Sequence, residues 1–96
     1  MARNQKLTNV VAGRTVQVAT GEPGKLFILF DDQSTMKVRT VGTAAISPGG
    51  KVKVIREAGP EFTLQFADGS TVNLQLADPG SSVAVRDMNN QIEYLG

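Results

Sequence analysis

The 96-residue sequence contains no cysteine, no histidine and no tryptophan. Without cysteine the chain has no disulfide, no thiolate metal ligand and no thiol nucleophile. Without histidine it has no imidazole base, so neither a Ser-His-Asp nor a Cys-His catalytic arrangement can form. Acid–base chemistry would have to come from carboxylates, lysines, hydroxyl groups or Tyr94. We therefore expect a protein that is not an enzyme and that uses no metal or other cofactor.

The charges nearly cancel, because ten Lys and Arg residues are balanced by nine Asp and Glu residues. A net charge of +1 is too small to attract nucleic acid or an anionic membrane by itself. The longest uninterrupted apolar run, at 26–30, has five residues, whereas a membrane-spanning helix needs ~20. The start of the chain also lacks the apolar stretch of a secretory signal. These features predict a cytoplasmic protein that does not enter the membrane.

Apolar and polar residues alternate with a period of two through most of the chain, which is typical of half-buried strands. Pro23-Gly24, Pro48-Gly49 and Pro79-Gly80 each fit a type II turn, in which glycine supplies the positive φ. Asn89-Asn90 tolerates the same left-handed region. The pattern predicts eight strands, at about 15–20, 25–31, 35–41, 51–57, 61–67, 71–77, 82–86 and 91–95.

One short helix is expected over residues 4–12. Leu7, Val10 and Val11 fall at helical spacing, and Gly13 can end the helix in the left-handed conformation. A helix of two or three turns is marginal alone, so it must pack its apolar stripe against the sheet.

The sequence resembles itself at a fixed offset of 36 residues. Residues 13–40 align with 49–76 without a gap and share seven identities in 28 positions, where composition alone gives about two. The identical pairs are Gly13/Gly49, Val16/Val52, Val18/Val54, Phe30/Phe66, Asp32/Asp68, Ser34/Ser70 and Thr35/Thr71. We interpret this as a tandem duplication of a three-stranded meander.

The expected fold is a single all-β domain over residues 1–96. Its internal repeats cover about 13–48 and 49–81, and a terminal hairpin at 82–96 completes it. Two curved sheets sharing one core form either a small barrel or a two-sheet sandwich. In strand length and turn density the chain resembles SH3-like barrels, a resemblance of architecture that implies no function.

The alternation also predicts which side chains face the core, because a slip of one residue would expose all of them. The predicted inward residues are Val16, Val18, Leu26, Ile28, Phe30, Met36, Val38, Val52, Val54, Phe62, Leu64, Phe66, Val72, Leu74, Leu76, Val83, Val85, Ile92 and Tyr94.

Two patterns that look like functional motifs have structural explanations. The repeated Phe-x-Asp-x-Ser-Thr segments, at 30–35 and 66–71, place aspartates in hairpin turns, where they cap their own backbone rather than converge on a metal. If both turns have the same geometry, Gln33 adopts the left-handed conformation that suits Gly69. The Gly-Lys pairs at 24–25 and 50–51 lack the other residues of a phosphate-binding loop and are expected in turns with solvated lysines.

The outward face of the first meander differs from that of the second. The central strand of the second copy presents Glu61, Thr63 and Gln65 outward, as expected for a solvated face, whereas the first copy presents an aromatic and a leucine. The residues expected to form this face are Lys25, Phe27, Leu29, Lys37, Arg39 and Val41. The face is therefore apolar at its centre and basic at its edge.

Three explanations compete for this face. The N-terminal helix could cover Phe27 and Leu29 and make the face ordinary core. The face could instead bind a protein partner or a second copy of the chain. Lastly, Phe27 could stack on single-stranded nucleic acid, flanked by Lys25, Lys37 and Arg39. We expect a non-catalytic interaction module that binds a protein or itself through this face, with nucleic-acid binding as the alternative.

Overall fold

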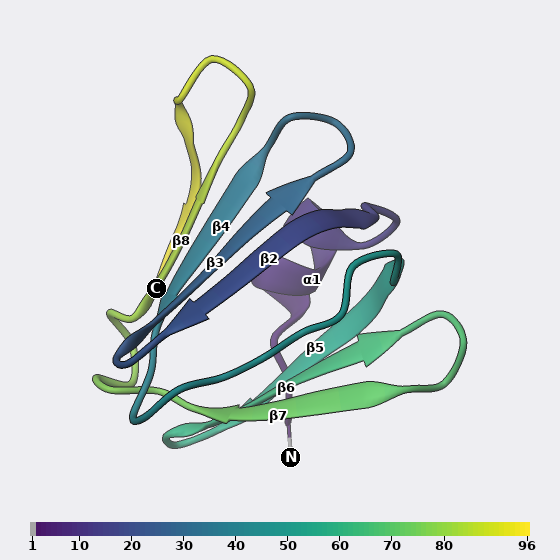
Figure 1. Ribbon diagram of the computed structural model, residues 1–96. Coiled ribbons are helices and arrows are strands. Elements are labelled where there is room, and N and C mark those ends of the chain that lie inside the picture. Colours follow the sequence, from purple (N-terminus) through teal and green to yellow (C-terminus); the bar gives the residue numbers. More distant parts are fainter. Residues whose placement is uncertain (1) are drawn as a thin grey trace.

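Two antiparallel sheets stack to form a sandwich (Figure 1). The computed structural model describes residues 2–96. The five-stranded sheet contains, in spatial order, β2 (Val16–Glu22), β3 (Lys25–Phe30), β4 (Thr35–Arg39), β8 (Val83–Arg86) and β9 (Ile92–Leu95). The four-stranded sheet contains β1 (Ala2–Arg3), β5 (Val52–Ala58), β6 (Glu61–Phe66) and β7 (Thr71–Gln75). All eight predicted strands are present, and the two-residue β1 is an addition.

The sandwich alternative of the expected fold is the one observed. Within residues 2–96 the two sheets are open, and they are not closed into a barrel. They touch through main-chain bridges at two corners, between Thr15 and Lys51 and between Thr40 and Leu76.

The two meanders have the same register at an offset of 36 residues. In the first, Lys25 lies opposite Arg39, and in the second Glu61 lies opposite Gln75. Every pair between β2 and β3 has its counterpart between β5 and β6, and every pair between β3 and β4 has its counterpart between β6 and β7. The two corner bridges also join residues that are 36 apart. The offset of 36 residues that relates the two halves of the sequence therefore also relates their strand pairings.

Bulges in β2 and β9 overturn two of the predicted inward positions. The register of β2 against β3 shifts between Val16 and Val18, so Val18 lies opposite Leu29 on the outward side. A bulge inserts one unpaired residue and reverses the alternation beyond it. A shift in the β8–β9 pair likewise places Ile92 opposite Arg86. The prediction that Val18 and Ile92 face the core was wrong, because both are exposed.

The rest of the predicted inward set forms the core, with Val72 and Tyr94 half-buried at its margin. The exception is Val54, which lies opposite Gln65 on the outward side of β5 although it is buried. The equivalent bulge in β5 adds Ile55, which lies opposite Leu64 and is fully buried. The loop residue Ile46 also joins the core, which the alternation of strands could not predict.

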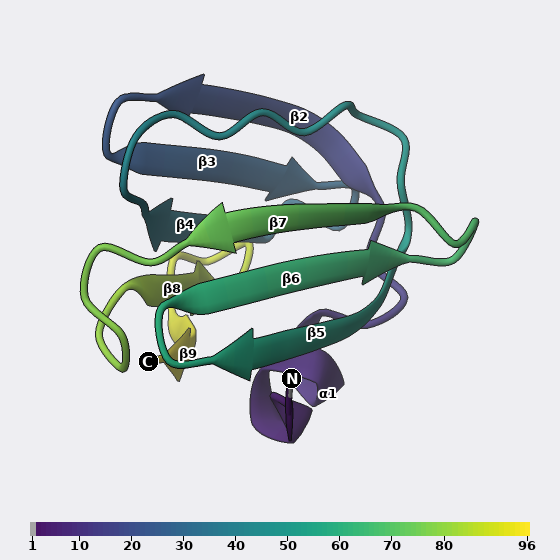
Figure 2. The same ribbon diagram turned by 90° about the horizontal axis from the view of Figure 1, so that it is seen from below.

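The helix α1 (Gln5–Val11) closes one side of the sandwich (Figure 2). Asn4 caps it, because the Asn4 side chain accepts a hydrogen bond from the amide of Leu7. Leu7 and Val11 are fully buried in the core, and the helix packs against β5 and β9. The first of the three explanations, in which this helix covers Phe27 and Leu29, is wrong. The helix fills the gap between the two sheets, against β5 and β9, whereas Phe27 and Leu29 lie on the outward side of β3.

A segment without helix or extended strand closes the side of the sandwich opposite to α1. Residues 41–51 run along β2 (Figure 2), and Val16 exchanges main-chain hydrogen bonds with Gly49 and Gly50. A Cβ at Gly21 would lie 1.8 Å from the Ala44 carbonyl oxygen, so only glycine permits this close approach.

The turns that follow β3 and β6 lead to a first prediction. Gln33 has a φ of 70° where Gly69 has 89°, and the amide of each donates to the equivalent Phe carbonyl, Phe30 or Phe66. For a residue with a Cβ, this conformation lowers the free energy of unfolding by about 1 kcal/mol. We expect Gln33→Gly to raise the midpoint of thermal unfolding by about 4 °C and Gly69→Gln to lower it similarly. A neutral or destabilising Gln33→Gly would show that the strain is absent.

The helix–strand contact leads to a second prediction. The Thr8 hydroxyl accepts a hydrogen bond from the amide of Ile55 at 3.0 Å and donates one to the Ile55 carbonyl at 3.3 Å, and both groups are buried. Thr8→Val keeps the shape but leaves a buried amide unpaired, which costs about 2 kcal/mol of unfolding free energy. Thr8→Ser retains the hydroxyl and is expected to cost less than half as much. Urea denaturation of both variants tests this, and equal stability of Thr8→Val and wild type would contradict it.

Candidate interaction face

The outer face of the five-stranded sheet is the surface turned away from the four-stranded sheet. Directly opposed residues of neighbouring strands share one face, so the registers define three rows across this surface. The first row is Val18, Leu29, Thr35, Arg86 and Ile92. The second is Thr20, Phe27, Lys37, Ala84 and Leu95. The third is Glu22, Lys25 and Arg39.

The structure brings five of the six predicted face residues together. Phe27 and Leu29 are half-buried, and Lys25, Lys37 and Arg39 are exposed beside them. Val41 lies beyond the end of β4, and its amide donates to the Gln75 carbonyl of the other sheet at 2.8 Å. Val41 therefore belongs to the corner between the sheets rather than to the three rows.

Sequence reasoning missed the apolar residues that widen this face. Val18, Ile92 and Leu95 are 45%, 51% and 62% exposed, and Ala84 lies half-buried between Lys37 and Leu95. The only sequence signal for the bulge next to Val18 is in the second meander, where Val54 and Ile55 are adjacent apolar residues that break the alternation. The apolar surface therefore lies on both sides of the central strand β4, not over the first meander alone.

The charges around these apolar residues are mostly positive. The three rows contain four bases and one acid, Glu22. Arg39 donates to the Ser81 carbonyl at 2.9 Å and lies 3.6 Å from the Asp78 carboxylate. Within the described side chains, Lys25 and Lys37 have no ion pair. The face thus combines exposed aliphatic groups with two ammonium groups that form no ion pair, of which Lys25 lies opposite Glu22 and Lys37 opposite Phe27 and Ala84.

A hollow of about 450 Å³ lies at the junction of β4, β8 and β9. Ala84 and Leu95 line it on the sheet, Lys37 and Arg39 line it from β4, and the loop 80–82 and Gly96 complete the wall. The hollow exists where a small side chain, Ala84, is flanked by two long ones.

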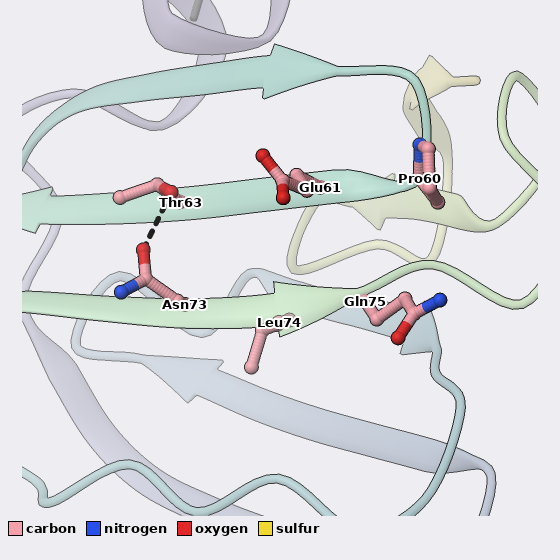
Figure 3. A pocket seen from close by; sticks show the side chains of 6 residues that line it. All are labelled: Pro60, Glu61, Thr63, Asn73, Leu74 and Gln75. Atoms are coloured by element: carbon pink, nitrogen blue, oxygen red, sulfur yellow. Dashed lines mark hydrogen bonds between the residues drawn. The ribbon is translucent and has the colours of Figure 1, made fainter.

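The outer face of the four-stranded sheet is polar except for the buried Val54, which lies opposite Gln65. Figure 3 shows the side chains of Thr63 and Asn73 pointing toward one another, and the Thr63 hydroxyl donates to the Asn73 amide oxygen at 2.7 Å. Glu61 and Gln75 lie beside them around a hollow of about 580 Å³. At the offset of 36, Thr63 is the counterpart of Phe27 and Asn73 that of Lys37. The sandwich therefore does not itself require an apolar residue at the position of Phe27.

The repeated acidic turns are occupied by structural contacts. Asp32 accepts hydrogen bonds from the amide and hydroxyl of Ser34, and Asp68 does the same from Ser70. Arg14 binds Glu93 through two hydrogen bonds of 2.9 Å. Its Nε also lies 3.3 Å from the Asp32 carboxylate. This cluster ties the turn after β3 to β9 rather than forming an open cleft.

One spacing in this region resembles a nucleophile–base pair. Ser34 and Lys37 are separated by two residues, as in the Ser-x-x-Lys motif of some hydrolases. Ser34 is buried and bonded to Arg14 and Asp32, whereas Lys37 is exposed on the outer face of β4. The two side chains therefore do not act on one another.

Among the described residues, no group of three or more acidic residues is arranged to hold a metal ion. Residues 2–96 contain one helix, of seven residues. It is not long and apolar enough to cross a membrane.

No family model, curated protein or solved structure matches this chain. Its function is therefore inferred from the residues of the outer face and from their contrast with the second meander.

The turn carboxylates give a third prediction. Partial burial alone would raise the pKa of Asp32, but the hydrogen bonds from Ser34 and the charge of Arg14 lower it below the usual value. The hydrogen bonds from Ser70 lower the pKa of Asp68. A carboxyl whose pKa is lower in the folded state stabilises the fold above its unfolded pKa of about 3.9, and this contribution is lost as pH falls below that value.

We therefore expect the midpoint of thermal unfolding to fall as pH decreases from 5 to 2. The double variant Asp32→Asn/Asp68→Asn should show a smaller fall, because it has lost both titrating groups. Thermal unfolding followed by circular dichroism across this range measures both slopes, and identical slopes would contradict the assignment.

Proposed function

We propose that this protein is a non-catalytic interaction module that binds another protein through the outer face of its five-stranded sheet. The observation that carries the proposal is the contrast between equivalent positions. Phe27 and Leu29 are half-buried apolar residues, whereas the equivalent Thr63 and Gln65 are polar. Exposed apolar side chains surrounded by charged ones are typical of protein interaction surfaces.

We further propose that the two meanders arose by duplication of one ancestral unit. The shared registers, the equivalent bulges and the matching Asp-Ser turns support this origin. On this view the second meander kept a solvated outer face, whereas the first acquired apolar residues. The change at Phe27 and Leu29 then reflects selection for binding, since the shared fold is maintained without it.

The composition of the face favours a protein over single-stranded nucleic acid. Binding to unpaired bases depends on aromatic platforms, and Phe27 is the only aromatic residue in the three rows. Tyr94 lies opposite the buried Val85 on the inner side. The other apolar groups are aliphatic and offer packing surface without stacking.

The charge of the face disfavours a second copy of this chain. In a two-fold symmetric dimer the same patch meets itself, so four bases and one acid would face the same set. Like charges at an interface oppose association. The partner is therefore a different molecule.

A fourth prediction tests the proposal with peptides selected from a random display library against the intact protein. We expect Leu29→Asp to weaken the binding of selected peptides at least about tenfold, because it places a charge in the apolar surface. Gln65→Asp occupies the equivalent register position on the other sheet and should change binding less than about twofold.

Urea denaturation of both variants separates lost binding from lost folding. A library that yields no binders, or peptides that bind Leu29→Asp as tightly as wild type, would overturn the proposal.

A further inference from the structure

We propose that the occupant of the outer face is a short acidic segment of another protein, which places an apolar side chain in the hollow over Ala84 and its carboxylates beside Lys37. This inference rests on the proposed function and specifies the chemistry of the partner. Three observations carry it: the width of the face, the shape of the hollow and the sign of the free charge.

The width of the face fits a short extended peptide. Five strands spaced about 4.8 Å apart span about 19 Å, and three rows cover about 13 Å along the strands. An extended segment of about six residues spans the same 19 Å.

The hollow supplies a place for one anchoring side chain. Its volume of about 450 Å³ is open at the surface, and Ala84 and Leu95 form its apolar part. Arg39 is held in the wall by its bond to the Ser81 carbonyl and by the nearby Asp78 carboxylate. Buried anchors in pockets contribute most of the binding energy at interfaces of this kind.

The free charge beside the hollow selects carboxylates. Lys37 lies directly between Phe27 and Ala84 on the outer face, and within the described side chains no acid pairs with it. An apolar anchor in the hollow would bring neighbouring acidic residues of the segment within reach of this ammonium group. Lys25 provides a second cation at the adjacent row.

The test uses three synthetic octapeptides with blocked ends, titrated into the ¹⁵N-labelled protein. The first has a central leucine between glutamates, the second replaces the leucine by serine, and the third replaces the glutamates by lysines. We expect only the first to bind with saturable shifts of the amides of Ala84, Lys37 and Leu95. Its affinity should fall as the salt concentration is raised, because its charges are screened.

Two pairs of variants separate the hollow from the charge. Ala84→Leu fills the hollow without changing charge and should weaken binding at least about tenfold, whereas Ala84→Ser leaves it open and should stay within about threefold. Lys37→Glu should weaken binding about tenfold, and Asn73→Glu, at the equivalent position of the second meander, should not. Chemical shifts of the remaining amides report whether each variant is folded.

The outcomes distinguish this inference from the broader proposal. If selected peptides bind the outer face but are not acidic, or bind Ala84→Leu as well as wild type, the identity of the occupant is wrong and the interaction module stands. If no peptide binds the face, both are wrong. Tighter binding of oligothymidylate or of phosphatidylglycerol vesicles through Lys37 would overturn both in favour of a nucleic acid or lipid partner.

Discussion

Main-chain pairing between equivalent residues at two corners fixes the arrangement of the whole domain. Thr15 pairs with Lys51 and Thr40 pairs with Leu76, and each bridge joins positions related by the offset of 36. An antiparallel bridge between like positions of two similar units implies a local two-fold axis between them. Once both corners are formed, the inner and outer sides of each meander are determined. The core, the helix and the outer face all depend on this constraint.

The two open sides of the sandwich are closed by different devices, and this breaks the symmetry. On one side α1 inserts Leu7 and Val11 into the core, and on the other the chain around Ala44 and Ile46 packs along β2. The terminal hairpin adds β8 and β9 to the first meander, whereas the second gains only the two-residue β1. Only the first meander therefore has a wide outer face, and the hollow lies where the added hairpin joins β4.

The sequence alone predicts the strands and most of the core because both follow from local periodicity and turn residues. Helix α1 is predicted from the spacing of Leu7 and Val11, and the left-handed Gln33 from its alignment with Gly69. The position of the helix is not predictable in this way, since its contacts with β5 and β9 are long-range. The candidate site is predicted only where alternation holds: Phe27, Leu29 and Lys37 are placed correctly, whereas Ile92 is assigned to the wrong side. A bulge changes side-chain direction without a clear local signature, and the burial of Ile46 depends on how a loop folds against a distant sheet.

The exposed aliphatic groups of the outer face would favour non-specific association if nothing opposed it. Two features of the same face act against this. Lys37 and Thr35, on the central strand, divide the apolar surface, so no large uninterrupted patch is presented. The excess of bases repels a second copy and any other basic surface, and it leaves acidic partners unaffected. If the face binds the acidic segment proposed above, the charges that oppose self-association also set its specificity, because an apolar group is then accepted only when carboxylates accompany it.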